Sequence, residues 1–174
     1  MSTNEALKLV VAADEIGAAL CRLIKTDLES KPVIRLVADW IDPVQFGGHR
    51  WRYPDLAVKA ARRIATGEAD RAVLVCGTGL GMAISANRVP GVRAVTAHDS
   101  YSVERSVKSN DAQILCLGAL VIGPALARRL VREWLEYRFD PASHSAANLA
   151  ALAAYDQVAA ATRVLVNGNG RAES

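Results

Sequence analysis

Residues 75–87 combine a thiol, a glycine-rich turn and the start of a predicted helix. The stretch reads VCGTGLGMAISAN, so Cys76 is followed by three glycines at alternate positions, Gly77, Gly79 and Gly81. Glycine lets the backbone turn sharply and aim successive N–H groups into one space, which suits an anion. The segment is not a Walker loop, because no Gly-Lys-Ser/Thr follows it. It also departs from the dinucleotide fingerprint, which needs a glycine where Met82 stands.

Cys76 ends a predicted strand just before that helix, a position that favours the thiolate. A thiolate beside an anion-holding loop can remove a proton from a carbon next to a carbonyl, and the loop can hold the resulting enediolate. The alternative is a buried structural cysteine, because cysteine is among the most buried residue types. Cys21 and Cys116 are expected to be buried structural cysteines, since Cys21 falls inside a predicted helix and Cys116 inside a predicted strand.

Two further polar residues follow predicted strands. Asp14 comes after an apolar run, where it suits either a hydrogen bond to a substrate hydroxyl or a cap on the next helix. His98 ends another apolar run. It suits either acid–base chemistry or a structural role at the rim of the sheet, with its hydrogen bonds made within the protein. Ligands of open α/β sheets bind at the carboxyl ends of the strands. We therefore expect Asp14, Cys76 and His98 to share one edge.

The elements that must position these residues alternate along the chain. Apolar runs predict strands at 7–13, 33–38, 71–76, 92–97 and 114–117. Apolar spacings of three and four residues predict helices at 16–30, 54–66, 80–87, 100–109, 124–137 and 147–166. This alternation indicates an α/β fold, a doubly wound parallel sheet of five strands.

Length and composition narrow the class of protein. The 174 residues fit a single domain, placed at 1–166, with a flexible tail at 167–174. The net charge of +3 is too small for a dedicated nucleic-acid binder, and three widely spaced cysteines make no disulfide framework. The polar N-terminus does not resemble a signal peptide, and no apolar run is long enough to span a membrane, so we expect a cytoplasmic protein. The alanine-rich helix at 147–166 is predicted to pack on a partner subunit.

Four segments now form a recognisable set: Asp14 after the first apolar run, Tyr53-Pro54, the stretch CGTGLGMAISANRVPG, and NDAQ at 110–113. Together they resemble the ribose-5-phosphate isomerase B / galactose-6-phosphate isomerase family over residues 8–156. The resemblance implies a Rossmann-like sheet and interconversion of aldose and ketose sugar phosphates without metal or organic cofactor. It also implies a homodimer or homotetramer in which two subunits build each active site.

The resemblance also implies a role for each matching residue, and it overturns the structural interpretation of Cys76. Cys76 corresponds to the base that moves a proton between C1 and C2, and Asp14 to a residue that meets a substrate hydroxyl. The loop that holds the enediolate corresponds to Thr78 and the three glycines. Asn110 matches an active-site asparagine, and Tyr53 is placed on the substrate side.

Several positions depart from the family pattern. The family often has histidine where this chain has Glu15, and commonly has a histidine that helps to open the sugar ring where this chain has Ser109. Phosphate-binding arginines are usual at Leu120 and near His144 and Asn148. Arginine is the best bidentate phosphate ligand, so its loss is not conservative.

Two explanations fit these departures. A tetrose phosphorylated on its terminal oxygen cannot close a furanose ring, so it needs no ring opening; members that act on erythrulose 4-phosphate and erythrose 4-phosphate look similar at 97–105 and 109–113. Alternatively the phosphate site has moved to the loop at 47–52, where Arg50 and Arg52 precede Tyr53. That loop also fits a solvated basic turn, and His144 is a further phosphate candidate.

The sequence thus predicts an aldose–ketose isomerase that works through a cis-enediolate. D-erythrulose 4-phosphate and D-erythrose 4-phosphate are the expected pair, with ribose 5-phosphate and ribulose 5-phosphate as the alternative. A non-catalytic sugar-phosphate-binding subunit of a heteromeric isomerase is the alternative of another class. The expected catalytic residues are Cys76, Thr78, Asp14 and His98. The expected substrate-binding residues are Gly77, Gly79, Gly81, Asn110, Tyr53, Glu15, Arg50, Arg52 and His144.

Overall fold

The computed structural model describes residues 5–41 and 51–168. The chain divides into two compact units, Met1–Phe139 and Asp140–Ser174. The first contains a parallel sheet of five strands in the order β2-β1-β3-β5-β4, which confirms the predicted α/β class. The second contains the helix α6 (Ala146–Gly168), and its packing on a partner stays a prediction. No helix within the described ranges has the length and apolar character needed to cross a membrane.

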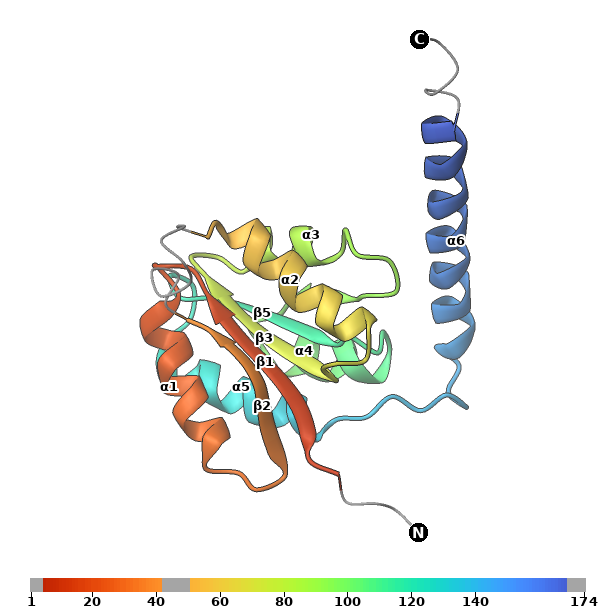
Figure 1. The fold of residues 1–174 in the computed structure, drawn as a ribbon. Helices are drawn as coiled ribbons and strands as arrows, with labels where there is room; N and C mark the ends of the chain where they lie inside the picture. The colour runs from red at the N-terminus through yellow and green to blue at the C-terminus, as the bar shows by residue number, and fades with distance from the viewer. Residues whose placement is uncertain (1–4, 42–50, 169–174) are drawn as a thin grey trace. The chain divides into compact units, whose positions relative to one another are not determined.

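The strands and helices of the first unit lie close to their predicted positions (Figure 1). The strands are β1 (Leu7–Ala13), β2 (Ile34–Trp40), β3 (Arg71–Cys76), β4 (Ala94–Thr96) and β5 (Ile114–Gly118). The helices are α1 (Ala18–Glu29), α2 (Tyr53–Ala65), α3 (Leu80–Ala86), α4 (Ser100–Lys108) and α5 (Pro124–Glu136).

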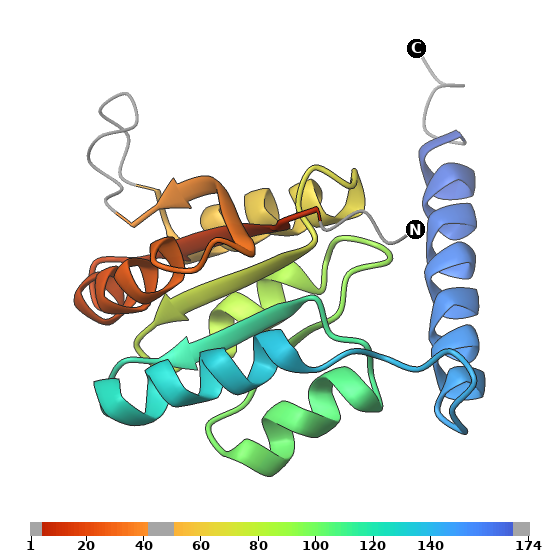
Figure 2. The same ribbon diagram turned by 90° about the horizontal axis from the view of Figure 1, so that it is seen from below.

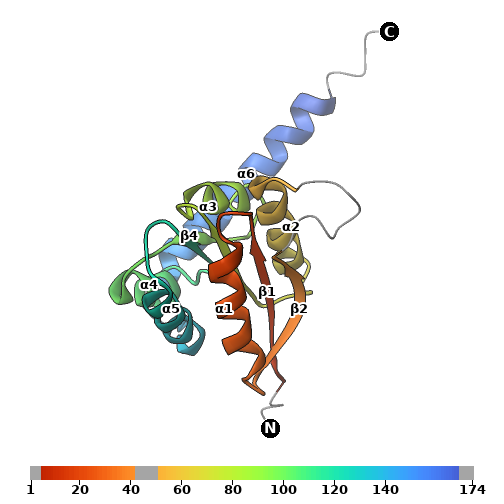
Figure 3. The same cartoon turned by 90° about the vertical axis from the view of Figure 1, so that its left-hand side faces the viewer.

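Helices cover both faces of the sheet, which explains why the central strands are continuously apolar. Side chains alternate between the faces, so Val73 and Val75 of β3 join a core with α1, α4 and α5. Leu74 and Cys76 point to the other face and join a core with α2 and α3. Figures 2 and 3 show the sheet between these two helix layers.

The strand order creates a topological switch point between β1 and β3. From β1 the chain continues to β2 on one side. From β3 it continues on the other side, first to β4 at the edge of the sheet and then to β5 between β3 and β4. The register pairs Ala13 with Val75, and the Asp14 N–H donates to the Val75 carbonyl at 3.3 Å. Asp14 and Cys76 are therefore neighbours at the carboxyl edge, where open α/β sheets bind ligands.

Candidate active site

Cys76 is the thiol that the fold places at the switch point. Its side chain is 5% exposed and faces the α2 and α3 side of the sheet. The Gly79 N–H donates to its Sγ at 3.1 Å, and a donor in that position stabilises negative charge on the sulfur. Cys21 and Cys116 differ: burial raises the pKa of each thiol far above its usual range. Cys76 is the thiol that receives a backbone donor at the carboxyl edge of the sheet.

Gly79 makes this hydrogen bond possible because it adopts a backbone conformation that other residues avoid. Its φ is +81°, in the left-handed region, where it caps α3. A Cβ here would also lie 3.0 Å from Thr96 Cγ2 and 3.1 Å from the Cys116 carbonyl oxygen. Thr78, just before it, is exposed, and its Oγ1 accepts from the Leu80 N–H at 3.4 Å. The turn thus buries the thiol and presents the threonine to solvent.

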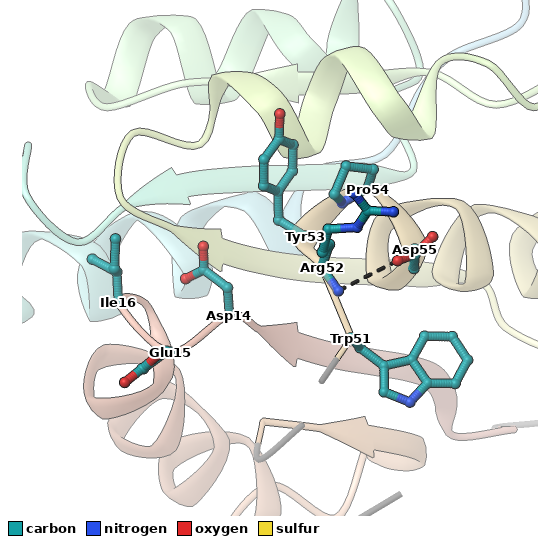
Figure 4. A pocket seen from close by; sticks show the side chains of 8 residues that line it. All are labelled: Asp14, Glu15, Ile16, Trp51, Arg52, Tyr53, Pro54 and Asp55. Atoms are coloured by element: carbon teal, nitrogen blue, oxygen red, sulfur yellow. Dashed lines mark hydrogen bonds between the residues drawn. The ribbon is translucent and has the colours of Figure 1, made fainter. Parts of the chain in front are cut away.

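A pocket of about 600 Å³ lies between the end of β1 and the start of α2. Its lining residues are Asp14, Glu15, Ile16, Trp51, Arg52, Tyr53, Pro54 and Asp55 (Figure 4). Cys76 is not in this lining, but two contacts connect the pocket with the glycine turn. One is the hydrogen bond from Asp14 to Val75, and the other is the packing of the Tyr53 ring on Gly81.

The Asp14 side chain both accepts a hydrogen bond before α1 and lines the pocket, the two positions that its place in the sequence allowed. Its Oδ1 accepts from the Gly17 N–H at 2.9 Å, which closes the turn before α1, and the side chain also lines the pocket. Gly17 is a residue that the sequence analysis missed. A Cβ there would lie 2.3 Å from the Val75 carbonyl oxygen, so only glycine lets this turn pack against β3.

His98 lies at the predicted edge, but its ring is tied to the backbone. Its Nε2 accepts from the Gly118 N–H at 2.9 Å, which joins the ends of β4 and β5. Burial lowers the pKa of His98, so the neutral ring needed for this bond is favoured. Its proton then resides on Nδ1, and that nitrogen alone stays available for a substrate. The structure therefore restricts the acid–base role expected of His98.

Leu120 shows what replaces one of the expected phosphate arginines. The Leu120 N–H donates to the Gly77 carbonyl at 3.0 Å, and its side chain is 75% exposed. A Cβ on Gly77 would lie 3.5 Å from Leu120 Cδ1 and 3.8 Å from the Ile16 side chain. The surroundings of Gly77 are thus apolar, with no guanidinium from this position to meet a phosphate.

Several predicted site residues are not brought together in one chain. Asn110 precedes β5, so it lies at the amino edge of the parallel sheet, opposite Cys76. There the Arg93 Nε donates to the Asn110 carbonyl at 2.9 Å. Arg50 lies outside the described residues, and His144 belongs to the second unit. Within the described ranges no cluster of three His, Cys, Asp or Glu side chains is arranged to hold a metal.

Comparison with known proteins supplies the decisive observation. The family model described as Ribose/Galactose Isomerase matches residues 9–152. The chain belongs to this family. The chain is therefore a sugar-phosphate isomerase, as the sequence predicted.

Three relatives illustrate the breadth of the ribose/galactose isomerase family. D-erythrulose-4-phosphate isomerase 2 of Mycolicibacterium smegmatis is 52% identical, over 87% of this chain and 98% of its own length. Ribose-5-P isomerase B of Listeria innocua is 42% identical, over 77% and 87%. The structure of Clostridium thermocellum ribose-5-phosphate isomerase B is 34% identical with a TM-score of 0.77, covering 87% of this chain and 98% of its own.

Proposed function

We propose that this isomerase interconverts D-erythrulose 4-phosphate and D-erythrose 4-phosphate through a cis-enediolate, with Cys76 as the base. The observation that carries the proposal is the Gly79 N–H on the Cys76 Sγ, at the sheet edge where ligands bind. The substrate follows from Ser109 in place of a ring-opening histidine and from the similarity to a relative named for erythrulose 4-phosphate. The free thiols at Cys21, Cys76 and Cys116 suit a reducing cytoplasmic setting.

The reaction moves one carbon-bound proton and one hydroxyl proton. The Cys76 thiolate takes a proton from C1 of the ketose, the C–H electron pair forms the C1=C2 double bond, and the C2 oxygen becomes negative. The glycine-turn N–H groups stabilise this enediolate. The Cys76 thiol then returns its proton to C2, while the O1 proton leaves and O2 gains one. Asp14 lines the pocket, and its N–H is hydrogen-bonded to Val75 next to Cys76, so its carboxylate suits the transfer between oxygens.

The phosphate is assigned to Arg52 rather than to the family's usual positions. Arg52 lines the pocket beside Tyr53, and its guanidinium forms no ion pair with any residue in the described part of the chain. The corresponding space near Gly77 holds Leu120. A guanidinium forms a bidentate pair of hydrogen bonds with phosphate, which would hold the phosphorylated end of a short sugar in one position.

We also propose that the active site is completed by a second copy of the chain. Cys76 and Asn110 lie at opposite edges of one sheet, so a single chain does not present both to one substrate. Exposed Ile16, Leu80 and Leu120 surround the glycine turn, a composition that suits burial against another subunit. A homodimer with shared sites accounts for both features.

The test is proton NMR in D₂O with the purified chain and four sugars, offered separately. These are erythrose 4-phosphate, ribose 5-phosphate and the two unphosphorylated parents. We expect ketose to form fastest from erythrose 4-phosphate, with deuterium in the transferred position. Cys76→Ala should fold normally and lose this exchange by at least about a hundredfold. Cys21→Ala, which removes a thiol from the opposite core, should retain it.

Three results would contradict the proposal. Faster turnover of ribose 5-phosphate would assign the alternative substrate. Near wild-type exchange by Cys76→Ala would remove the assigned base. Binding of a sugar phosphate with no exchange of any carbon-bound proton would indicate the non-catalytic subunit.

A further inference from the structure

Lys59 lies between two tryptophan rings near the proposed active site. Its Nζ is 4.4 Å from the centroid of Trp40 and 4.5 Å from that of Trp51. Trp40 ends β2 and is 5% exposed, so it is a fixed wall of the core. Trp51 precedes α2 and is only partly buried. The Lys59 ammonium thus lies between the buried Trp40 ring and the ring of Trp51, a residue that belongs to no helix or strand.

Trp51 contacts both Lys59 and the pocket. It lines the pocket together with Arg52 and Tyr53, the next two residues of the chain (Figure 4). The indole Nε1 is buried with no hydrogen-bond partner among residues 5–41 and 51–168, so a polar bond to the indole does not hold the ring there. Trp51 packs on the core that the sheet forms with α2 and α3, and the Lys59 ammonium is the charged contact over its ring.

We propose that Lys59 is a positioning residue for the substrate pocket, acting through Trp51 to hold Arg52 and Tyr53. The proposal rests on the proposed function, in which these two residues contact the substrate. Lys59 itself does not line the pocket, and the glycine turn with Cys76 belongs to a different segment. The Trp40–Lys59–Trp51 stack therefore governs substrate binding and leaves proton transfer unaffected.

Because Lys59 acts on substrate binding and Cys76 on proton transfer, loss of Lys59 should change KM and not kcat. Loss of an interaction that is equal in the ground and transition states raises KM with kcat unchanged. Two cation–π contacts at a partly exposed site correspond to a change of about five- to thirtyfold in KM. Lys59→Arg should restore KM, because a guanidinium also stacks on aromatic rings.

The experiment compares Lys59→Met with Lys59→Arg and Arg62→Met. Methionine keeps the length of the aliphatic stem and its helix propensity while removing the charge. Arg62 is exposed on the same helix, so its variant removes one positive charge near the same surface without entering the stack. We expect a raised KM and an unchanged kcat in Lys59→Met alone, with the melting temperature within a few degrees of wild type.

A second measurement separates this proposal from the substrate assignment. Acrylamide quenching of tryptophan fluorescence needs no substrate, and it should increase in Lys59→Met but not in Lys59→Arg or Arg62→Met. Unchanged quenching with an unchanged KM would refute the positioning role even if the enzyme isomerises the expected sugar. A fall in kcat at constant KM would also refute it, because Lys59 would then affect proton transfer. Increased quenching in an enzyme inactive on all four sugars would support the stack and overturn the proposed function.

Discussion

At the scale of single residues, two glycines of one motif perform different tasks. Gly79 is required by its left-handed backbone, which lets its N–H reach the Cys76 sulfur. Gly81 has no such requirement. A Cβ there would lie 2.5 Å from Tyr53 Cε2, so this glycine makes room for a ring from α2. The sequence pattern predicted a loop that holds an anion, which stays a prediction; the structure adds that Gly81 makes room for Tyr53 in the pocket wall.

Gly81→Ala should therefore displace Tyr53 and weaken substrate binding. We expect KM to rise about fivefold or more, since a ring displaced from its site no longer contributes binding. The free energy of unfolding should change by less than about 1 kcal/mol, because alanine's helix propensity offsets the cost of moving a partly exposed ring. Steady-state kinetics and urea unfolding measure the two quantities.

Gly123→Ala provides the matched control. Nothing lies within 4 Å of a Cβ at Gly123, so the same substitution meets open space there. Its KM should equal that of wild type. If Gly81→Ala also has the wild-type KM, then Tyr53 contributes no substrate contact that depends on its position.

At the scale of elements, β3 is anchored to α5 through a buried arginine. Arg71, at the start of β3, is 8% exposed and donates to the carbonyls of Trp134 and Tyr137 at the end of α5, the latter at 2.7 Å. Its guanidinium also lies 4.7 Å from the Trp134 ring centroid. Burial lowers the pKa of Arg71 to about 10, so it stays charged at neutral pH. One side chain thus caps a helix whose last carbonyls lack partners within the helix.

Arg71→Met should destabilise the fold without changing kcat. Two carbonyls would lose charged donors in a poorly solvated place, at a cost of about 2–4 kcal/mol in the free energy of unfolding. Urea unfolding followed by circular dichroism measures this change. Arg128→Met, which removes the exposed ion pair with Asp27, should have a much smaller effect. Equal stabilities of the two variants would show that the Arg71 cap is energetically unimportant.

Most elements could be predicted from apolar periodicity, and the differences have local causes. β4 was expected over 92–97 but spans only Ala94–Thr96. The Val92 N–H turns back to the Val89 carbonyl, and the Arg93 N–H donates to Gln113 Oε1. These contacts take the N–H groups of Val92 and Arg93 away from strand pairing, although the Arg93 carbonyl still accepts from the Gln113 N–H at 3.0 Å. No apolar pattern records them.

Some parts of the candidate site could likewise be predicted from the sequence, and others could not. Strand ends could be predicted, and with them the shared edge of Asp14, Cys76 and His98. The packing of Tyr53 on Gly81 and of Lys59 between two tryptophans could not, because each joins segments that only the tertiary fold brings together. Trp51 had one weak signal, an aromatic residue placed between basic ones.

At the scale of the whole molecule, the sheet separates two groups that the proposed reaction needs together. Cys76 ends β3 at the carboxyl edge, and Asn110 precedes β5 at the amino edge. Parallel strands cannot bring opposite edges together within one unit. If both residues act on one substrate, then Asn110 must come from another copy of the chain, and inactive chains must be able to complement each other.

Co-expression of Cys76→Ala and Asn110→Ala chains tests this arrangement directly. Each single variant should be nearly inactive, since every site in its own homodimer lacks a group. Random pairing makes half of the dimers mixed, and each mixed dimer has one intact site of two, so activity should recover to about a quarter of wild type. Co-expression of Cys76→Ala with Cys76→Ser is the matched control, because no pairing of these chains restores the thiol. Recovery no greater than in this control would place all the catalytic groups of each site within one chain, and Asn110 would then act only on the structure of the amino edge.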